Sequence, residues 1–277
     1  MLKRFWVDNY RSLKSVTMDL GQLTVVTGAN GSGKSNLYSA LGLLQSAAAG
    51  RLSVDLLEEG GMPSALWAGG RGTGPVRMKL GFTLEELSYE VEAGLVAVGR
   101  HNPFVLDPEI KAEYVWLGAH RKKSTTMVDR GSGSVSLTNF EGSRELIKAA
   151  LNPSESVISQ IADPSAYPEL SFLRSELARW RFYHHFDTAR GGHSRAVLPG
   201  VRTRTLAADG ANLGAAIATL SVNGDIAALH EAVNQAFPGY RPVVLDNMVS
   251  GYRDFVKWGP LVEAAVEDSD TVRMAVK

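Results

Sequence analysis

Residues 23–35 of this chain read LTVVTGANGSGKS, and this segment decides the fold. Residues 28–35 match the pattern GxxxxGK(S/T), in which successive backbone N–H groups curl around phosphate groups. Such a curl needs a loop with little side-chain bulk, and Gly28, Gly31 and Gly33 provide it. The sequence therefore predicts a loop that holds the phosphates of a nucleoside triphosphate.

Features beside the glycines fit the same prediction. Lys34 would bring a mobile positive charge to the outer phosphates, and Ser35 would offer its hydroxyl to Mg²⁺. A helix that begins here would direct the positive end of its dipole at the anion. We therefore expect a nucleoside triphosphate and Mg²⁺ as cofactors, with Ser35 as the residue that contacts the metal.

Such a loop requires a buried strand before it and a helix after it. Residues 23–27 form a short, apolar, β-rich run, which predicts the buried strand. Beyond the loop, apolar residues recur at helical spacing, at Leu37, Ala40, Leu41 and Leu44. The flanking pattern is that of a strand, a loop and a helix.

The composition is that of a globular protein. The chain has 277 residues, 44% of them hydrophobic, which is enough to build a core. Lys plus Arg and Asp plus Glu both number 29, so the formal net charge is zero. The overall charge therefore gives no electrostatic reason to expect that the protein binds nucleic acid or an anionic membrane. The absence of cysteine excludes disulfides and thiolate metal sites. No stretch approaches the ~20 apolar residues of a membrane span, so we expect a soluble cytoplasmic protein without a membrane partner.

Alternation of apolar and polar residues predicts strands through much of the first half. Two strands are expected before the loop, at 2–8 and 16–20, joined by a turn at 9–12. After a Gly/Pro-rich loop at 60–75, further strands are expected at 76–84, 87–91, 110–116 and on both sides of a hairpin tip at 129–133. The third of these would place Ile110, Ala112, Tyr114 and Trp116 on one face. Together these strands predict a block of antiparallel sheet.

The second half has a mixed pattern. From 143 to 180 it is helical, and Pro153, Pro164 and Pro168 favour several short helices over one long helix. A strand is then expected at 180–187 and an arginine-rich loop at 190–204. Beyond these we expect helices at 213–220 and 225–237, and strands at 243–245, 255–258 and 271–276.

The segments around the loop resemble a known family. The order of a strand, an NYRS turn, a second strand and LTVVTGANGSGKSNL is similar to the RecF/SMC branch of the ABC-type ATPases. The likeness is greatest to RecF-like bacterial predicted ATPases of the AAA/ABC class. PSAYPELSFLRSELARWRFYHHFD at 164–187 and LAADGANLGAAIATL at 206–220 also look like the middle of such ATPases.

This resemblance implies an α/β fold, a P-loop NTPase head lobe of the ABC type with an antiparallel β subdomain and a helical subdomain. It implies one partial head over 1–277, divided into a Walker A lobe at 1–60, an antiparallel β subdomain at 76–140, a helical insertion at 143–180, and returning strands and helices at 181–277. Such heads act as ATP-dependent dimers with ATP and Mg²⁺ between the protomers, so the resemblance implies either a homodimer or another partner that supplies the signature motif. DNA is a further expected partner.

The resemblance also implies a set of nucleotide-binding residues. The arginine of the NYRS turn matches the family's turn, and the loop matches through the asparagine that follows it. The implied set is Arg11, Gly28, Ala29, Asn30, Gly31, Ser32, Gly33, Lys34, Ser35 and Asn36.

The other end of the chain departs from the family pattern. A Walker B site needs four apolar residues, then Asp, then Glu, but Asp246 is followed by Asn247. Residues 220–224, LSVNG, imitate a signature motif, so the two segments are either a degenerate site or an ordinary helix and strand. We expect the true signature and Walker B segments to lie outside these residues, and we assign no catalytic residue.

Three functions remain open from the sequence. The first is ATP binding and, in a complete dimeric head, ATP hydrolysis coupled to DNA maintenance, repair or defence. The second is a nucleotide-binding regulatory or assembly module that does not hydrolyse ATP, because its catalytic half is missing or is supplied by another chain. The third is a small-molecule or nucleotide kinase, against which the hairpin and antiparallel block argue. Whether the chain is an enzyme stays open, and alone we expect it to hydrolyse ATP poorly or not at all.

Two further groups of residues are candidates for a binding site. His185 and Asp187 would share one face of the strand expected at 180–187, whereas His184 would face away, and no third metal ligand is in sight. The arginines at 190–204 and the basic run at 120–123 would either meet phosphates or form solvated surface, and the second interpretation is favoured.

Overall fold

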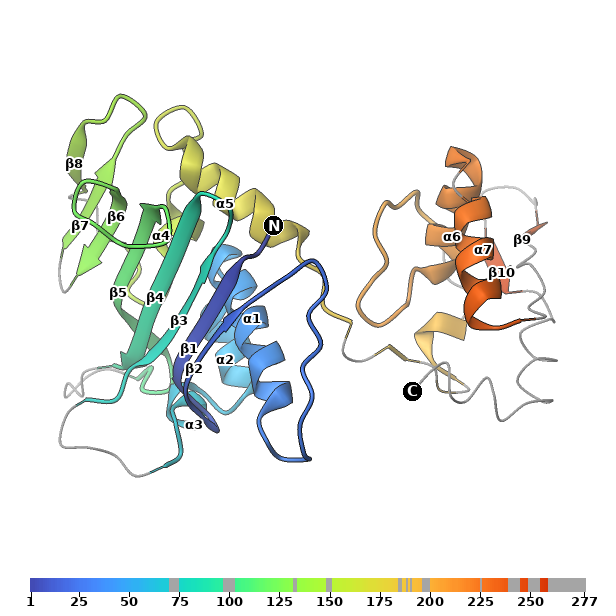
Figure 1. Cartoon of the computed structure of the whole chain (residues 1–277), viewed down its shortest axis with the longest axis horizontal. Coiled ribbons are helices and arrows are strands. Elements are labelled where there is room, and N and C mark those ends of the chain that lie inside the picture. Colours follow the sequence, from blue (N-terminus) through green and yellow to red (C-terminus); the bar gives the residue numbers. More distant parts are fainter. Residues whose placement is uncertain are drawn as a thin grey trace. The chain divides into compact units, whose positions relative to one another are not determined.

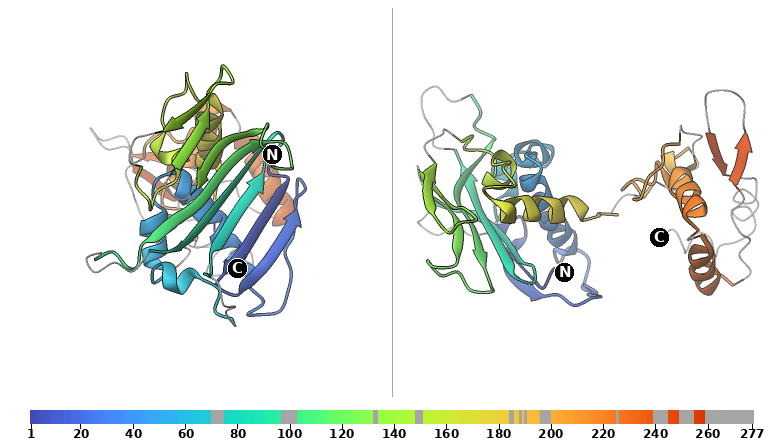
Figure 2. Two further views of the ribbon diagram at one scale, coloured as in Figure 1. Left: turned by 90° about the vertical axis from the view of Figure 1, so that its left-hand side faces the viewer. Right: turned by 90° about the horizontal axis from the view of Figure 1, so that it is seen from above.

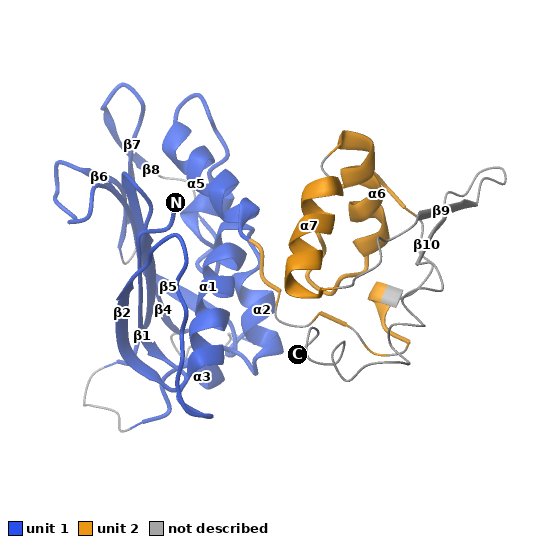
Figure 3. Cartoon of the chain, turned by 45° about the vertical axis from the view of Figure 1, so that its right-hand side comes forward, with its two compact units in different colours: residues 1–180 blue, residues 181–277 orange. Residues whose placement is uncertain are grey.

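The computed structural model describes residues 1–69, 75–96, 103–131, 134–147, 151–183, 186–187, 189, 191–195, 200–224, 226–238, 245–248 and 255–258. The chain divides into two compact units, residues 1–180 and residues 181–277 (Figure 3). Each unit is described by itself.

The first unit is built on an eight-stranded antiparallel sheet (Figure 1). The strand order is β2-β1-β3-β4-β5-β6-β7-β8, so the chain leaves the β1–β2 hairpin and returns on the other side of β1. The strands are β1 (Arg4–Tyr10), β2 (Leu13–Asp19), β3 (Met78–Thr83), β4 (Leu87–Leu95), β5 (Pro108–Leu117), β6 (Thr126–Gly131), β7 (Ser134–Thr138) and β8 (Arg144–Ile147). The antiparallel block predicted from alternation is confirmed, as are the two strands before the loop.

Helices cover one face of this sheet (Figure 2). They are α1 (Lys34–Ala48), α2 (Leu52–Glu58), α3 (Met62–Ala65), α4 (Val157–Gln160) and α5 (Pro168–Arg179). The core lies between the helices and the sheet, where apolar side chains of both layers are fully buried; they include Phe5, Val7, Leu80, Phe82, Tyr89, Leu44, Ala47, Leu173 and Leu177. Burial of this apolar surface is the main force that fixes α1 on the sheet.

Four sequence-based predictions about this unit and the segment that directly follows it need correction. The loop expected at 60–75 contains the short helix α3. Part of the stretch expected to be helical is strand β8, because residues 144–147 pair with β7 and this pairing overrides the local pattern. No strand forms among the described residues of 180–187; Trp180 packs edge-on against Phe82, with ring centroids 5.3 Å apart.

The fourth correction concerns β5, whose residues do not all alternate as predicted. The register of β4 and β5 shifts between Glu92 and Ala93, so that Ala93 pairs with Ile110 but Glu92 pairs with Ala112. This bulge inserts one residue into the alternation. As a result Glu113, which pairs with the buried Val91, turns toward the helices.

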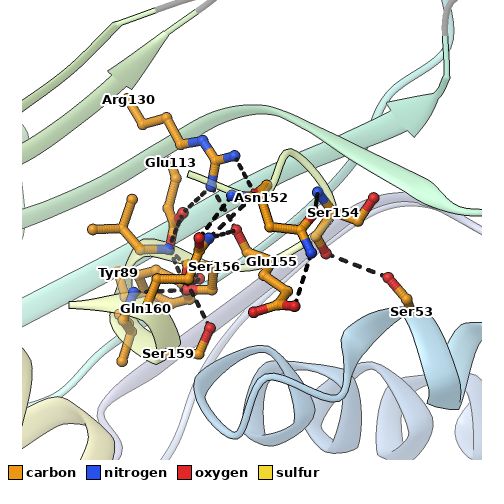
Figure 4. Close-up of polar contacts among 12 residues, drawn as sticks. Ser53, Tyr89, Glu113, Arg130, Asn152, Ser154, Glu155, Ser156, Ser159 and Gln160 are labelled. Atoms are coloured by element: carbon orange, nitrogen blue, oxygen red, sulfur yellow. Dashed lines mark hydrogen bonds and ion pairs between the residues drawn. The ribbon is translucent and has the colours of Figure 1, made fainter. Parts of the chain in front are cut away.

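Glu113 is the centre of a buried polar network (Figure 4). The hydroxyls of Tyr89 and Ser156 donate to its Oε1, and the backbone N–H of Val157 donates to its Oε2 at 2.8 Å. The Arg130 guanidinium lies 3.4 Å from the same Oε2. Burial raises the pKa of Tyr89 well above its ordinary value, and the adjacent Glu113 raises it further. The carboxylate therefore has the partners that a buried charge requires.

The same network fixes the short helix α4 and the segment before it. Arg130 also donates to the carbonyls of Glu155 at 2.6 Å and Asn152 at 3.1 Å. The Ser156 hydroxyl caps the N-terminus of α4 by accepting from Ile158 N–H. From α5, the Arg174 Nε donates to the Ile158 carbonyl at 2.9 Å. A four-residue helix has little stability of its own, so these contacts hold it.

A single side chain ties α1 to the end of α5. The Gln45 amide donates to the carbonyls of Leu177 and Trp180 at 2.8 and 2.9 Å. The Leu177 carbonyl also accepts from the Trp180 N–H at 3.1 Å, so Gln45 adds a side-chain partner at the end of α5, where carbonyls lack the regular helical bond. The orientation of α1 is therefore set by the sheet on one side and by α5 on the other.

The second unit contains the helices α6 (Leu213–Asn223) and α7 (Ile226–Ala236), both predicted from the sequence. It also contains a 3₁₀ turn at His193–Arg195 and a two-stranded ribbon of β9 (Leu245–Met248) and β10 (Phe255–Trp258). The strand predicted at 255–258 is confirmed, and that at 243–245 is described only from Leu245 onward. The strand predicted at 271–276 lies outside the described residues.

Candidate nucleotide-binding site

The glycine-rich loop adopts a conformation that only glycines allow at key positions. Gly31 and Gly33 have φ angles of 81° and 99°, in the left-handed region. A Cβ on Gly33 would lie 2.8 Å from Leu13 Cδ2 and 2.9 Å from Ser12 Oγ. The backbone conformation therefore requires glycine at positions 31 and 33, and at Gly33 there is also no space for a side chain.

Lys34, the first residue of α1, folds back over the loop. Its ammonium group donates to the carbonyls of Gly28 at 2.7 Å and Ala29 at 2.8 Å. An ammonium has three donors, so these two bonds leave one for an anion. The positive charge is thus held against the first residues of the loop.

The N-terminus of α1 adds a favourable potential for an anion. Gly33 caps the helix in the left-handed conformation, and the first turn contains no acidic residue. The helix dipole and the unpaired N–H groups of the first turn therefore face no competing carboxylate on that turn. Ser35 is exposed there, and the loop from Gly28 to Ser32 is exposed throughout. The loop thus fits a nucleotide's phosphates, and the Ser35 hydroxyl fits one ligand position of Mg²⁺.

The segment that leads into the loop does not form the buried strand that its sequence predicts. Residues 23–27 form no strand, and their apolar side chains are exposed, with Leu23 at 85% and Val25 at 73%. The chain leaves the edge strand β2 at Asp19 and turns, with Gly21 N–H donating to the Thr24 hydroxyl at 3.1 Å. A strand needs a neighbour to pair its backbone groups, and no described strand lies beside this segment.

The turn at 9–12 holds Arg11 in an unusual conformation. Arg11 has a φ of 48° and Asn9 a φ of 55°, both rare for residues other than glycine. Arg11 Nη2 lies 2.9 Å from Glu59 Oε2, and the guanidinium lies over the Tyr10 ring. The contact that this turn makes with the loop comes from Ser12, whose hydroxyl accepts from the Asn36 amide at 2.7 Å. Asn36 is therefore in direct contact with this turn, whereas the guanidinium of Arg11 is paired with Glu59.

Sequence reasoning missed Glu59, the residue that fixes Arg11. It directly follows α2, and its carboxylate accepts from the Tyr10 hydroxyl at 2.9–3.0 Å. Burial raises the pKa of Tyr10, and the Glu59 charge raises it further. No local pattern marks Glu59, because its partners Arg11 and Tyr10 lie far from it in the sequence, Tyr10 by 49 positions.

The other candidates lie elsewhere. Asp187 organises a turn in the second unit by accepting from Ala189 and His193 N–H groups, whereas residues 184 and 185 lie outside the described residues. The guanidinium of Arg121 lies 3.5 Å from the Tyr114 ring centroid on the sheet, as surface packing. Within the described part of the chain, no three His, Asp or Glu side chains are grouped to hold a metal ion.

The arginine loop is described only in part. Arg190 lies outside the described residues, and Arg202 and Arg204 lie in an irregular segment. Asp246 lies in β9, opposite Lys257 of the antiparallel strand β10.

A glycine-rich loop that opens a helix, with a lysine folded over it on an α/β scaffold, defines the class of P-loop nucleotide-binding domains. The chain belongs to the family described as "AAA domain, putative AbiEii toxin, Type IV TA system", whose model matches residues 23–259. This is a family of P-loop ATPase domains, so the predicted fold class is confirmed.

Two other comparisons give more limited matches. A UDP-glucose 4-epimerase of Rhizobium leguminosarum bv. trifolii is 49% identical over 39 residues, which are 14% of this chain and 12% of that protein. The chain thus spans a small part of that relative's length. A solved chain from "Structural biochemistry of ATP-driven dimerization and DNA stimulated activation of SMC ATPases" has a TM-score of 0.28 and 19% identity, covering 44% of this chain and 72% of that one.

None of the described helices combines the length and the apolar composition needed to cross a membrane.

Proposed function

We propose that this chain binds ATP with Mg²⁺ through Gly28, Ala29, Asn30, Gly31, Ser32, Gly33, Lys34 and Ser35. The observation that carries this proposal is the position of Lys34, whose ammonium lies against the carbonyls of Gly28 and Ala29 at the start of α1. The loop amides would hold the phosphates, Lys34 would neutralise their charge, and Ser35 would contact the metal. Asn36 and Arg11 would support the loop and the phosphates.

Bound ATP would supply the phosphoanhydride bond, and this chain would bind and orient it. In the proposed complete head, ATP lies between two protomers, and a partner supplies the signature motif. A P-loop lobe normally buries the segment before its loop against neighbouring strands. The exposed apolar side chains of Leu23, Val25 and Val26 therefore support a head that is completed by further strands beside this segment. Hydrolysis in that head would be coupled to DNA maintenance, repair or defence. The family description names a putative toxin, which favours defence.

A second candidate is a regulatory or assembly module that binds ATP without hydrolysing it. The observation that favours it is at Asp246, which precedes an asparagine and pairs with Lys257 in an antiparallel ribbon. A carboxylate that activates water must follow the metal-binding aspartate, and Asn247 carries no charge.

Binding and turnover test the two candidates. Calorimetric titration with Mg-ATP should show binding to the wild-type chain and its loss in Lys34→Ala, whereas Lys14→Ala, another lysine of the same unit, should bind normally. Under the second candidate no phosphate is released over hours. ATP hydrolysis that Lys34→Ala abolishes and Asp246→Ala leaves unchanged would show that a catalytic acid lies elsewhere in the chain. Unchanged binding in Lys34→Ala would contradict both candidates.

A further inference from the structure

Tyr10, Arg11 and Glu59 form a compact polar cluster beside the start of α1. The Glu59 carboxylate accepts from the Tyr10 hydroxyl and pairs with Arg11 Nη2 at 2.9 Å. Tyr10 is fully buried, the Glu59 side chain is 18% exposed, and the Arg11 side chain is 33% exposed. Glu59 is therefore anchored on its buried side by a rigid phenol and meets the guanidinium on its outer side.

The cluster lies close to the phosphate loop. The Tyr10 hydroxyl is within hydrogen-bonding reach of Ser39, which lies one helical turn after Ser35, about 6 Å along α1. On the other side of Arg11, Ser12 touches both Gly33 and Asn36. The two sequence neighbours of Arg11, Tyr10 and Ser12, thus both contact the first turns of α1.

The backbone of Arg11 is held in place by bonds from a distant segment. Its N–H donates to the Ala65 carbonyl at 2.8 Å, and its carbonyl accepts from Ala68 N–H at 3.1 Å. A left-handed conformation at a non-glycine residue persists only where surrounding contacts determine it. Both ends of this arginine, its backbone and its guanidinium, are therefore fixed by the fold.

We propose that Glu59 is a positioning residue that holds the Arg11 guanidinium in the orientation in which it contacts the phosphates of the bound nucleotide. This inference rests on the proposed function of the loop and on Arg11 as part of it. A guanidinium has five donors, so the pair with Glu59 leaves a second edge for phosphate oxygens. An arginine that is already oriented loses less side-chain entropy on binding than a mobile one.

The direction in which one substitution changes Mg-ATP affinity shows whether Glu59 positions Arg11 or competes with phosphate for it. Removing a carboxylate near a bound anion would, by charge alone, strengthen binding. If Glu59 positions Arg11, Glu59→Gln instead weakens Mg-ATP binding, by about three- to tenfold for a weakened charged contact. Tighter binding in Glu59→Gln would mean that Glu59 competes with phosphate for Arg11, and would overturn the proposal.

The experiment is a double-mutant cycle on the full chain, with Mg-ATP affinity measured by calorimetry. Arg11→Ala should weaken binding at least as much as Glu59→Gln, and the double variant should be no weaker than Arg11→Ala alone. Tyr10→Phe, which removes only the anchoring hydroxyl, should cause a smaller loss that also disappears in the Arg11→Ala background. Glu92→Gln is the matched control, because Glu92 is also 18% exposed and pairs with Arg77 on the sheet.

The outcomes assign any failure to one of the two proposals. Losses that add in the double variant, or unchanged affinity in both Glu59→Gln and Tyr10→Phe, would overturn the positioning role. If Lys34→Ala loses binding while Arg11→Ala binds like wild type, only this inference fails. If wild type and Lys34→Ala bind alike, the proposed function itself fails.

Discussion

The Asn36 side-chain amide donates a 2.7 Å hydrogen bond to the Ser12 hydroxyl, and this bond joins the first turn of α1 to the tip of the β1–β2 hairpin. The same hydroxyl occupies the space that a Cβ on Gly33 would need. The hairpin therefore supports the phosphate loop from one side, which gives a structural reason for a hairpin to precede the loop in this chain.

Ser12→Ala should weaken Mg-ATP binding without unfolding the protein. The variant removes one exposed hydrogen bond, worth about 0.5–1.5 kcal/mol, and lets the start of α1 move. Calorimetry should show a loss of about two- to tenfold in affinity. Ser15→Ala is the control, since Ser15 bonds to Asp8 on the same hairpin at 2.6 Å and does not reach the loop. Equal losses in the two variants would contradict a specific role for Ser12.

Gly33→Ala and Gly42→Ala should change stability in opposite directions. At Gly33 the φ of 99° and the nearby Leu13 side chain both oppose a Cβ, so we expect a loss of at least about 1 kcal/mol together with loss of nucleotide binding. Gly42 lies inside α1 with no atom within 4 Å of an added Cβ, so alanine there should stabilise by about 0.5–1 kcal/mol. Urea unfolding measures both, and a stabilised Gly33→Ala would contradict the loop geometry.

The sequence predicted those parts of the fold that depend on local patterns. The glycine loop, the helix after it and most strands are encoded by spacing that neighbouring residues share. The exposure of residues 23–27 could not be predicted in this way, because burial of a strand requires a neighbouring strand, and an apolar run has the same sequence pattern with or without one.

Glu113 shows a second reason why prediction stops short. The bulge between Glu92 and Ala93 changes which residues of β5 face the core, and no local signal in the alternation marks it. Simple alternation would place Glu113 on the solvent face, but its carboxylate is buried and paired with Arg130. Likewise Glu59 joins the site only because the chain folds α2 back beside the β1–β2 turn.

Arg130→Met should be strongly destabilising, because it leaves the buried Glu113 carboxylate without its cation. We expect a loss of about 3–5 kcal/mol in the free energy of unfolding, measured with urea. Adding Glu113→Gln should recover part of it, because the uncompensated charge is removed. Arg144→Met is the control: its pair with Asp129 is exposed, so the change should stay within about 0.5 kcal/mol. Equal effects at both arginines would contradict the buried network.

Val25→Ala and Val7→Ala compare the same substitution in exposed and buried settings. Val7 is fully buried in β1, so its loss should cost about 1.5–3 kcal/mol, whereas Val25 is 73% exposed and should cost less than about 0.5 kcal/mol. Hydrogen exchange gives an independent measure: the amides of residues 24–26 should exchange much faster than those of β1, because no described strand pairs with them. If Val25→Ala is as costly as Val7→Ala and these amides are protected, then the segment packs as a strand in solution, and the prediction from its sequence is right after all.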